Sequence, residues 1–306
     1  MIDRRVAWRL STGRWKERTR NMSNDELTRR DFVTMTVAAG LAAAAGSDVT
    51  AQQAVEKNVE IKTPDGTCDA AFIHPASGAH PAVIIWPDAF GLRPSMRDMA
   101  KRLAAAGYSV LVPNPFYRVA KSPVFEDASK VDFQKERSKL TPLMGSITAD
   151  GTVERDAPAF VAWLDMQKEV DRNKKIGTQG YCMGGALVVR TAAAVPSRIG
   201  AGGSFHGGGL VTDRPNSPHL LAPKIKARMY FGIATNDDMQ QPDAKTKLKA
   251  AFDAAKVPAE IEVYSMSQHG WCVPDMPAGA NGPIYNKPDA ERAWAKLVAL
   301  YKAALV

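Results

Sequence analysis

The chain has 306 residues, of which 45% are hydrophobic and 24% are charged, a balance typical of globular proteins rather than disordered ones. Its formal net charge is +8, but residues 52–306 carry only +5, from 31 Lys and Arg against 26 Asp and Glu, which argues against a nucleic-acid-binding surface. Three cysteines without a Cys-x-x-Cys pair exclude a disulfide scaffold and a cysteine-rich zinc site.

The N-terminal segment, residues 1–51, has the pattern of an export signal. Residues 28–33 read Thr-Arg-Arg-Asp-Phe-Val, a mild apolar stretch follows, and small side chains precede a cleavage point after Ala51. This order resembles a twin-arginine signal, whose partner is the export machinery and whose product is periplasmic or secreted. Met22 is an alternative start, and a frayed helix on a cytoplasmic protein is the other interpretation. No apolar run reaches ~18 residues, so we expect no permanent membrane span.

Residues 52–306 alternate between strand patterns and helix patterns. The predicted strands are 58–62, 67–73, 82–86, 109–112, 175–178, 199–205, 228–233 and 260–264. The predicted helices are 95–106, 152–166, 184–194, one opening at 242–243, and one from 288 to about 304. Residues 118–150 show no clean period and are expected to form an insertion. A hairpin followed by strand–helix alternation predicts an α/β fold, a mostly parallel sheet of about eight strands with helices on both faces.

The segment after the fifth strand carries the clearest chemical motif. Residues 180–185 read Gly-Tyr-Cys-Met-Gly-Gly, the nucleophile elbow Gly-x-Ser-x-Gly with Cys182 in place of serine. Glycines are needed on both sides because the turn from strand to helix is very tight. The backbone N–H of Met183, at the helix start, is the expected first oxyanion donor.

A cysteine nucleophile needs a base, and the base needs an acid that orients it. In this fold their chain order is nucleophile, acid, histidine. His269 follows the last predicted strand, and the acid is expected after strand 228–233, where Asp237 and Asp238 are adjacent. We favour Asp237 from its spacing to the strand, and Asp238 remains an alternative.

Two further loops are expected to border the site. Residues 206–209 read His-Gly-Gly-Gly, which matches an esterase oxyanion loop as a string but follows the wrong strand. We therefore interpret His206 as a substrate-side residue at the pocket rim. The loop after strand 82–86 is in the right place, and the N–H of Ala89 is the expected second oxyanion donor.

With these residues in place, the chain resembles the dienelactone hydrolase family over roughly residues 56–304. The resemblance rests on the elbow, on Asp-Ala-Phe-Gly-Leu at 88–92, on His-Gly-Trp at 269–271, and on the segment 285–294. It implies an α/β-hydrolase fold, a Cys–His–Asp triad that opens enol-lactones, and no metal or other cofactor.

This chain departs from the family pattern at the substrate-binding positions. Where the family has a glutamate that contacts the resting thiol, this chain has Asp88. Arg118 loosely matches one of two arginines that hold the substrate carboxylate in the family, and Val273 stands at the place of the other. The resemblance therefore implies substrate contacts by Asp88 and Arg118, with a substrate that differs from the dienelactone.

The sequence thus predicts a carboxylic ester or lactone hydrolase that acts on a small molecule through an acyl-thioester, without nucleic acid. A catalytically silent, exported small-molecule-binding protein is the alternative. A thiol redox protein that uses Cys182 with Cys272 is a weaker third interpretation, because it needs the two Cα atoms within about 7 Å.

Overall fold

The computed structural model describes residues 53–280 and 282–305. The predicted signal segment, its cleavage point and the choice of start codon lie outside these residues. Within the described part, no helix combines the length and apolarity needed to cross a membrane.

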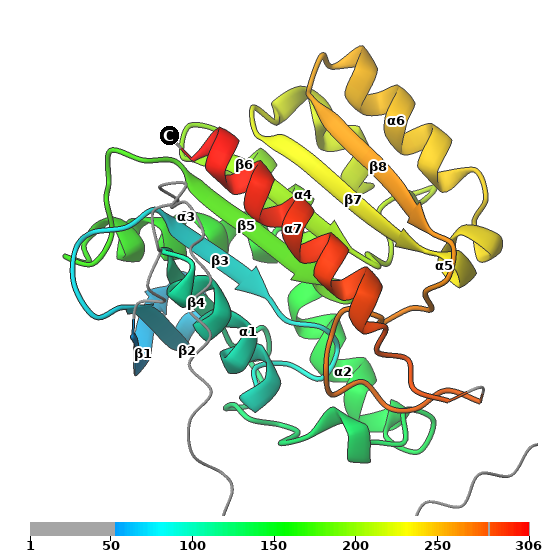
Figure 1. The fold of residues 1–306 in the computed structure, drawn as a ribbon, viewed down its shortest axis with the longest axis horizontal. Coiled ribbons are helices and arrows are strands. Elements are labelled where there is room, and N and C mark those ends of the chain that lie inside the picture. The colour runs from blue at the N-terminus through cyan, green and yellow to red at the C-terminus, as the bar shows by residue number, and fades with distance from the viewer. Residues whose placement is uncertain (1–52, 281, 306) are drawn as a thin grey trace, which may run out of the picture. The chain divides into compact units, whose positions relative to one another are not determined.

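The centre of the fold is one eight-stranded sheet in the order β1-β2-β4-β3-β5-β6-β7-β8 (Figure 1). Its strands are β1 (Ala54–Thr63), β2 (Gly66–Pro75), β3 (Ala82–Trp86), β4 (Ser109–Pro113), β5 (Ile176–Tyr181), β6 (Ile199–Phe205), β7 (Arg228–Ala234) and β8 (Ala259–Tyr264). The first two strands form an antiparallel hairpin, β2 pairs antiparallel with β4, and all remaining pairs are parallel. This confirms the predicted α/β class and the mostly parallel sheet.

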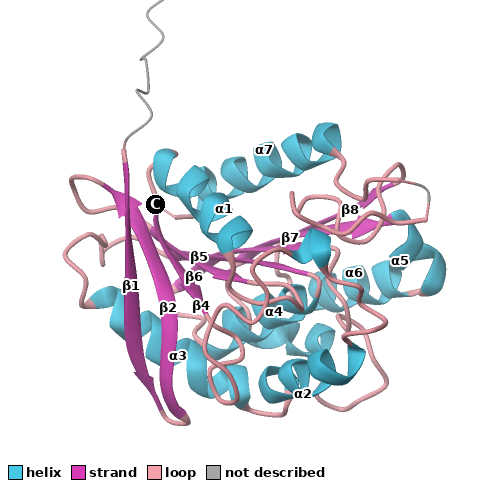
Figure 2. Cartoon of the chain, turned by 90° about the horizontal axis from the view of Figure 1, so that it is seen from below, coloured by secondary structure: helices cyan, strands magenta, loops and turns pink. Residues whose placement is uncertain are grey.

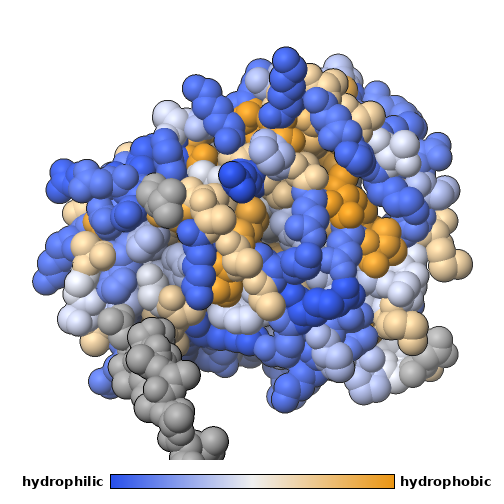
Figure 3. Space-filling model, turned by 45° about the horizontal axis from the view of Figure 1, so that its top comes forward, coloured by the Kyte–Doolittle hydropathy of each residue, from blue (hydrophilic) through white to orange (hydrophobic). Residues whose placement is uncertain are grey.

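Helices cover both faces of the sheet. They are α1 (Pro94–Ala105), α2 (Arg137–Thr148), α3 (Thr152–Asp165), α4 (Met183–Ala194), α5 (Thr235–Gln240), α6 (Ala244–Ala254) and α7 (Lys287–Ala304), with short 3₁₀ turns at Ala128–Lys130 and Pro218–Lys224. Figure 2 shows α1 and α7 on one face, and α3, α4 and α6 on the other. Figure 3 shows one side of the surface, where apolar side chains lie among hydrophilic ones.

The buried strands alternate between two hydrophobic cores. In β3, Ile84 and Trp86 join the core under α3, α4 and α6, while Val83 and Ile85 join the core under α1 and α7. A strand buried on both faces reads as a continuous apolar run because successive side chains point to opposite sides. This explains why the run 82–86 could be assigned from sequence.

The insertion at 118–150 contains a helix that the sequence did not predict. α2 buries Leu140, Leu143 and Ile147 on one face, but Pro142 and Gly145 lie inside it, and both residue types disfavour helix. Likewise, α5 occupies a segment for which no helix was predicted, and α6 begins at Ala244, slightly after the expected opening at 242–243. In such a sheet, the carboxyl ends of the parallel strands form the edge where active sites lie.

Candidate active site

The turn at Cys182, which matches the nucleophile-elbow motif, is strained as that motif requires. Cys182 has φ 53° and ψ −117° between the end of β5 and the start of α4, a conformation that L-residues with side chains rarely adopt. A Cβ on Gly180 would lie 2.2 Å from the carbonyl oxygen of Gly184, and a Cβ on Gly184 would lie 2.4 Å from the carbonyl oxygen of Trp86. Glycine at these positions therefore lets strand, helix and the start of the β3 loop pack together around the thiol.

His206 is hydrogen-bonded to the backbone of the turn at Cys182. Its imidazole is fully buried, its φ is 40°, and its Nδ1 accepts a 3.0 Å hydrogen bond from the N–H of Cys182. Burial and the charge of nearby His269 hold the pKa of His206 well below its usual range, so the ring is neutral with its proton on Nε2. Substrate contact by His206 stays a prediction, which this burial does not support.

His269 is held from α5 by two side chains. Its Nδ1 lies 2.8 and 3.0 Å from the two carboxylate oxygens of Asp237, and its backbone N–H donates to Oδ1 of Asn236 at 2.8 Å. Asp238 instead forms an ion pair with Lys245 at 2.7 and 2.8 Å. The geometry thus places Asp237, and not its neighbour, against the imidazole.

The charges around His269 favour the imidazolium form. Burial acts to lower the pKa of His269, but hydrogen bonds with Asp237 and Cys182 outweigh it and raise the pKa to about 10. The His269 ring is one-third exposed, and Cys182 is partly exposed. A thiol beside an imidazole that a carboxylate orients is equipped for nucleophilic attack on a carbonyl.

Two backbone N–H groups flank the elbow as candidate oxyanion donors. Met183 is the first residue of α4, so its N–H belongs to the helix N-terminus that follows the thiol. Ala89 lies in the loop after β3, whose first residues pack on Gly184. Within residues 53–280 and 282–305, neither N–H has a hydrogen-bond acceptor in a loop or side chain.

Asp88 is buried in an ion-pair cluster that also contains Arg93 and Asp275. Arg93 is fully buried and donates to Asp88 at 2.8 and 2.9 Å and to Asp275 at 2.7 and 2.8 Å. Its fifth N–H donates to the carbonyl of Gly91 at 3.2 Å. Arg93 and Asp275 were not among the predicted site residues, although Arg93 follows the loop of Ala89 and Asp275 lies six positions after His269.

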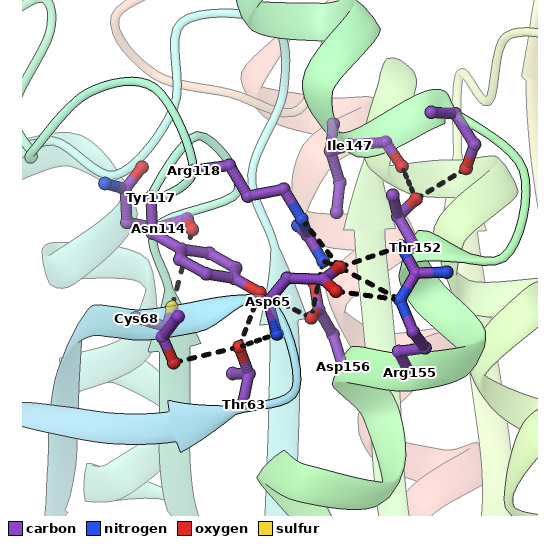
Figure 4. A network of polar contacts seen from close by, with 12 residues as sticks. Thr63, Asp65, Cys68, Asn114, Tyr117, Arg118, Ile147, Thr152, Arg155 and Asp156 are labelled. Atoms are coloured by element: carbon purple, nitrogen blue, oxygen red, sulfur yellow. Dashed lines mark hydrogen bonds and ion pairs between the residues drawn. The ribbon is translucent and has the colours of Figure 1, made fainter.

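Arg118 lies in a separate polar network near the β1–β2 turn (Figure 4). Its Nη2 donates to Asp65 at 2.8 Å and to Asp156 at 2.7 Å, while Arg155 also binds Asp65. Hydrogen bonds from Arg155 and Arg118 hold the pKa of Asp65 at about 2. Substrate binding by Asp88 and Arg118 stays a prediction, since both charges are already paired in this structure.

A cavity of about 640 Å³ lies between α1 and α7. Tyr181, Phe205 and Cys272 line it, so it borders the residues next to the elbow without including Cys182, His269 or Asp237. All three cysteines of the chain are free. Among the described residues, no group of three or more His, Cys, Asp and Glu side chains gathers in a metal-binding arrangement.

Comparison with known proteins gives the family. The chain is 25% identical over 250 residues to a carboxymethylenebutenolidase of Rhodococcus opacus, covering 80% of this chain and 90% of that protein. Two solved structures share the fold. One is a dienelactone hydrolase-like promiscuous phosphotriesterase from metagenomic libraries, with a TM-score of 0.67, 23% identity, and coverage of 83% of this chain and all of that chain. The other is a dienelactone hydrolase from Anabaena variabilis, with a TM-score of 0.55, 17% identity and the same coverage. The model of the dienelactone hydrolase family matches residues 68–305, and the chain therefore belongs to that family of hydrolases.

Proposed function

We propose that this protein hydrolyses carboxylic esters or enol-lactones through a Cys182–His269–Asp237 triad and an acyl-thioester intermediate. The observation that carries the proposal is the strained elbow thiol, whose neighbour His269 is held by Asp237. Family membership supports hydrolysis in general. The named roles of the three residues are part of the proposal.

In the first half of the reaction, the Cys182 thiolate attacks the substrate carbonyl carbon and forms a C–S bond. The carbonyl oxygen becomes an oxyanion, which accepts hydrogen bonds from the N–H groups of Met183 and Ala89. Removing one such donor typically costs about 10²–10³ in rate. The oxyanion collapses, the C–O bond to the leaving group breaks, and the His269 imidazolium gives that oxygen its proton.

In the second half, neutral His269 takes a proton from water as the water attacks the thioester carbonyl. The second tetrahedral intermediate expels the Cys182 thiolate and releases a carboxylic acid. Asp237 accepts from Nδ1–H throughout and stabilises the imidazolium each time it forms.

The charge pairing around the site supports a substrate without a carboxylate on its acyl side. Arg118 and Arg93 are each bound to two carboxylates, and position 273 holds a fully buried valine. We therefore propose an uncharged ester or lactone.

The second candidate is an exported small-molecule-binding protein without activity, which the cavity between α1 and α7 favours because it is separate from the triad. Export itself is a further part of the proposal and rests on the twin-arginine pattern in residues 28–33. A mature N-terminus at Gln52 in the periplasmic fraction would support export. An intact N-terminus in the cytoplasm would contradict it.

The deciding experiment is hydrolysis of 4-nitrophenyl acetate and a small enol-lactone by the full chain, beside Cys182→Ala. We expect turnover by the wild type and none above background by the variant. If both are folded and inert, the binding-protein candidate takes precedence. If Cys182→Ala keeps full activity, the proposed nucleophile is wrong.

A further inference from the structure

The most unusual buried group near the site is the Arg93 guanidinium. It has no exposed surface, and each of its five N–H groups donates a hydrogen bond, four to carboxylates and one to a carbonyl. Five donors are the full capacity of an arginine, so the ion-pair cluster leaves no part of Arg93 for a substrate.

The two carboxylates belong to different loops at the carboxyl edge of the sheet. Asp88 follows β3 and directly precedes Ala89, the candidate oxyanion donor. Asp275 follows β8, six positions after His269, and also accepts from the N–H of Ala128 in the insertion at 3.2 Å. The Arg93 guanidinium therefore joins two loops that no strand pairing connects, and the Asp275 carboxylate links both to the insertion.

The loop that contains Ala89 depends on the ion pairs of Arg93 with Asp88 and Asp275 more than the other parts of the site do. The imidazole of His269 has its own anchors on α5, and the thiol is held by the elbow glycines and His206. The Ala89 loop instead contains a single tight turn, in which Asp88 accepts from the N–H of Phe90 and of Gly91. The two hydrogen bonds from Arg93 hold the Asp88 carboxylate, which in turn accepts from the N–H of Phe90 in that turn.

We propose that Arg93 is a positioning residue. By joining Asp88 to Asp275, it holds the backbone N–H of Ala89 in place beside the turn at Cys182. The inference rests on the proposed function, because it assigns Arg93 to the formation of the oxyanion. It concerns the rate of acylation and not substrate affinity. Misplacement of a reacting or stabilising group by about 1 Å can cost about 10² in rate.

The test compares Arg93→Met, Arg93→Lys and the triple variant Asp88→Asn, Arg93→Met, Asp275→Asn. Arg93→Met leaves the buried carboxylate of Asp88 and the partly buried carboxylate of Asp275 without a counter-ion, which is strongly destabilising. The triple variant removes all three charges. If the single variant fails to fold, the effect of losing Arg93 on kcat can therefore still be measured in the triple variant. Arg102→Met is the matched control, because Arg102 on α1 also binds a carboxylate, that of Glu291, but is half-exposed.

Each variant is measured for kcat and KM with 4-nitrophenyl acetate, for the rate of Cys182 alkylation by iodoacetamide, and for its thermal midpoint. Alkylation creates no oxyanion, so it reports the thiol and His269 alone. We expect Arg93→Met to lower kcat about 10²-fold with KM nearly unchanged and alkylation within about twofold. The triple variant should regain thermal stability but not kcat. Arg93→Lys should remain slow because an ammonium lacks the fork.

Three results would overturn the inference. Recovery of kcat in the triple variant would make Arg93 a charge-balancing group only. A parallel fall of kcat and alkylation in that variant would mean that the cluster supports the whole site. If the wild type alkylates normally but hydrolyses no ester or lactone, the proposed function fails, and the positioning role falls with it.

Discussion

Replacement of Asp237 by asparagine tests the centre of the proposed mechanism, and Asp238→Asn supplies a neighbouring control. The pKa of His269 is about 10 against an ordinary value of 6.5, a difference of about 5 kcal/mol at about 1.4 kcal/mol per pH unit. Asp237 and Cys182 both contribute to this free-energy difference, and solvent at the exposed part of the ring screens their charges. About 2 kcal/mol for Asp237 is therefore reasonable, or roughly 30-fold in imidazolium stability.

The amide also favours the wrong imidazole tautomer, because its NH₂ group can donate to Nδ1 where the carboxylate accepts. Together these effects should lower kcat by about 10²–10⁴. Asp238→Asn breaks a partly exposed pair with Lys245, worth about 0–1 kcal/mol, and should leave kcat within about twofold. Steady-state hydrolysis of 4-nitrophenyl acetate by the three proteins measures both. A large loss in Asp238→Asn with none in Asp237→Asn would refute the assignment.

Further predictions concern thiols, pH and the elbow. In the native, unreduced protein only Cys182 should react rapidly with a disulfide reagent, because burial raises the pKa of Cys68 and of Cys272; the unfolded chain should show three thiols, and a loss of two would instead indicate a disulfide. The raised pKa of His269 stabilises the fold fully below about pH 6.5, and this stabilisation is lost as the pH rises toward about 10. The free energies of unfolding of the wild type and His269→Gln in urea should therefore converge over that range. A constant difference between the two would contradict the prediction. Gly180→Ala places a Cβ against Gly184 and should cost about 1–3 kcal/mol in urea unfolding. Gly208→Ala has no atom within 4 Å of its Cβ and should change stability by less than about 0.5 kcal/mol; equal effects would show that the close approach is not the cause.

The sheet and the elbow could be predicted because their signals are local. The run 82–86 is continuously apolar, and the glycines around Cys182 mark a strand-to-helix turn within six residues. The choice between Asp237 and Asp238 was different, since it depends on α5, a six-residue helix with no recognisable period. Neighbouring residues on a helix point about 100° apart, so only the structure separates the one at His269 from the one at Lys245.

The ion-pair cluster was beyond local reasoning for another reason. Arg93 and Asp275 are 182 positions apart, and an arginine before a proline reads as an exposed loop residue. Its burial follows from the pairing itself, because a guanidinium loses its hydration at tolerable cost only where carboxylates replace the water. Local reasoning also could not place the His206 ring, which is buried and accepts from the N–H of Cys182; substrate contact by His206 stays a prediction.

The separate anchoring of the site's parts has a kinetic consequence. The thiol depends on glycine contacts and His206, the imidazole on α5, and the Ala89 donor on Arg93. If these supports are independent, variants in different supports should add in free energy, whereas variants within the thiol–imidazole–carboxylate unit should not, because each abolishes the same proton transfer. Asp237→Asn combined with Arg93→Met should therefore multiply their losses in kcat, while Asp237→Asn combined with Cys182→Ala should be no slower than Cys182→Ala alone. A loss in the first pair no larger than that of Asp237→Asn alone would mean that Arg93 acts through the imidazole, and the division of the site into separate supports would be wrong.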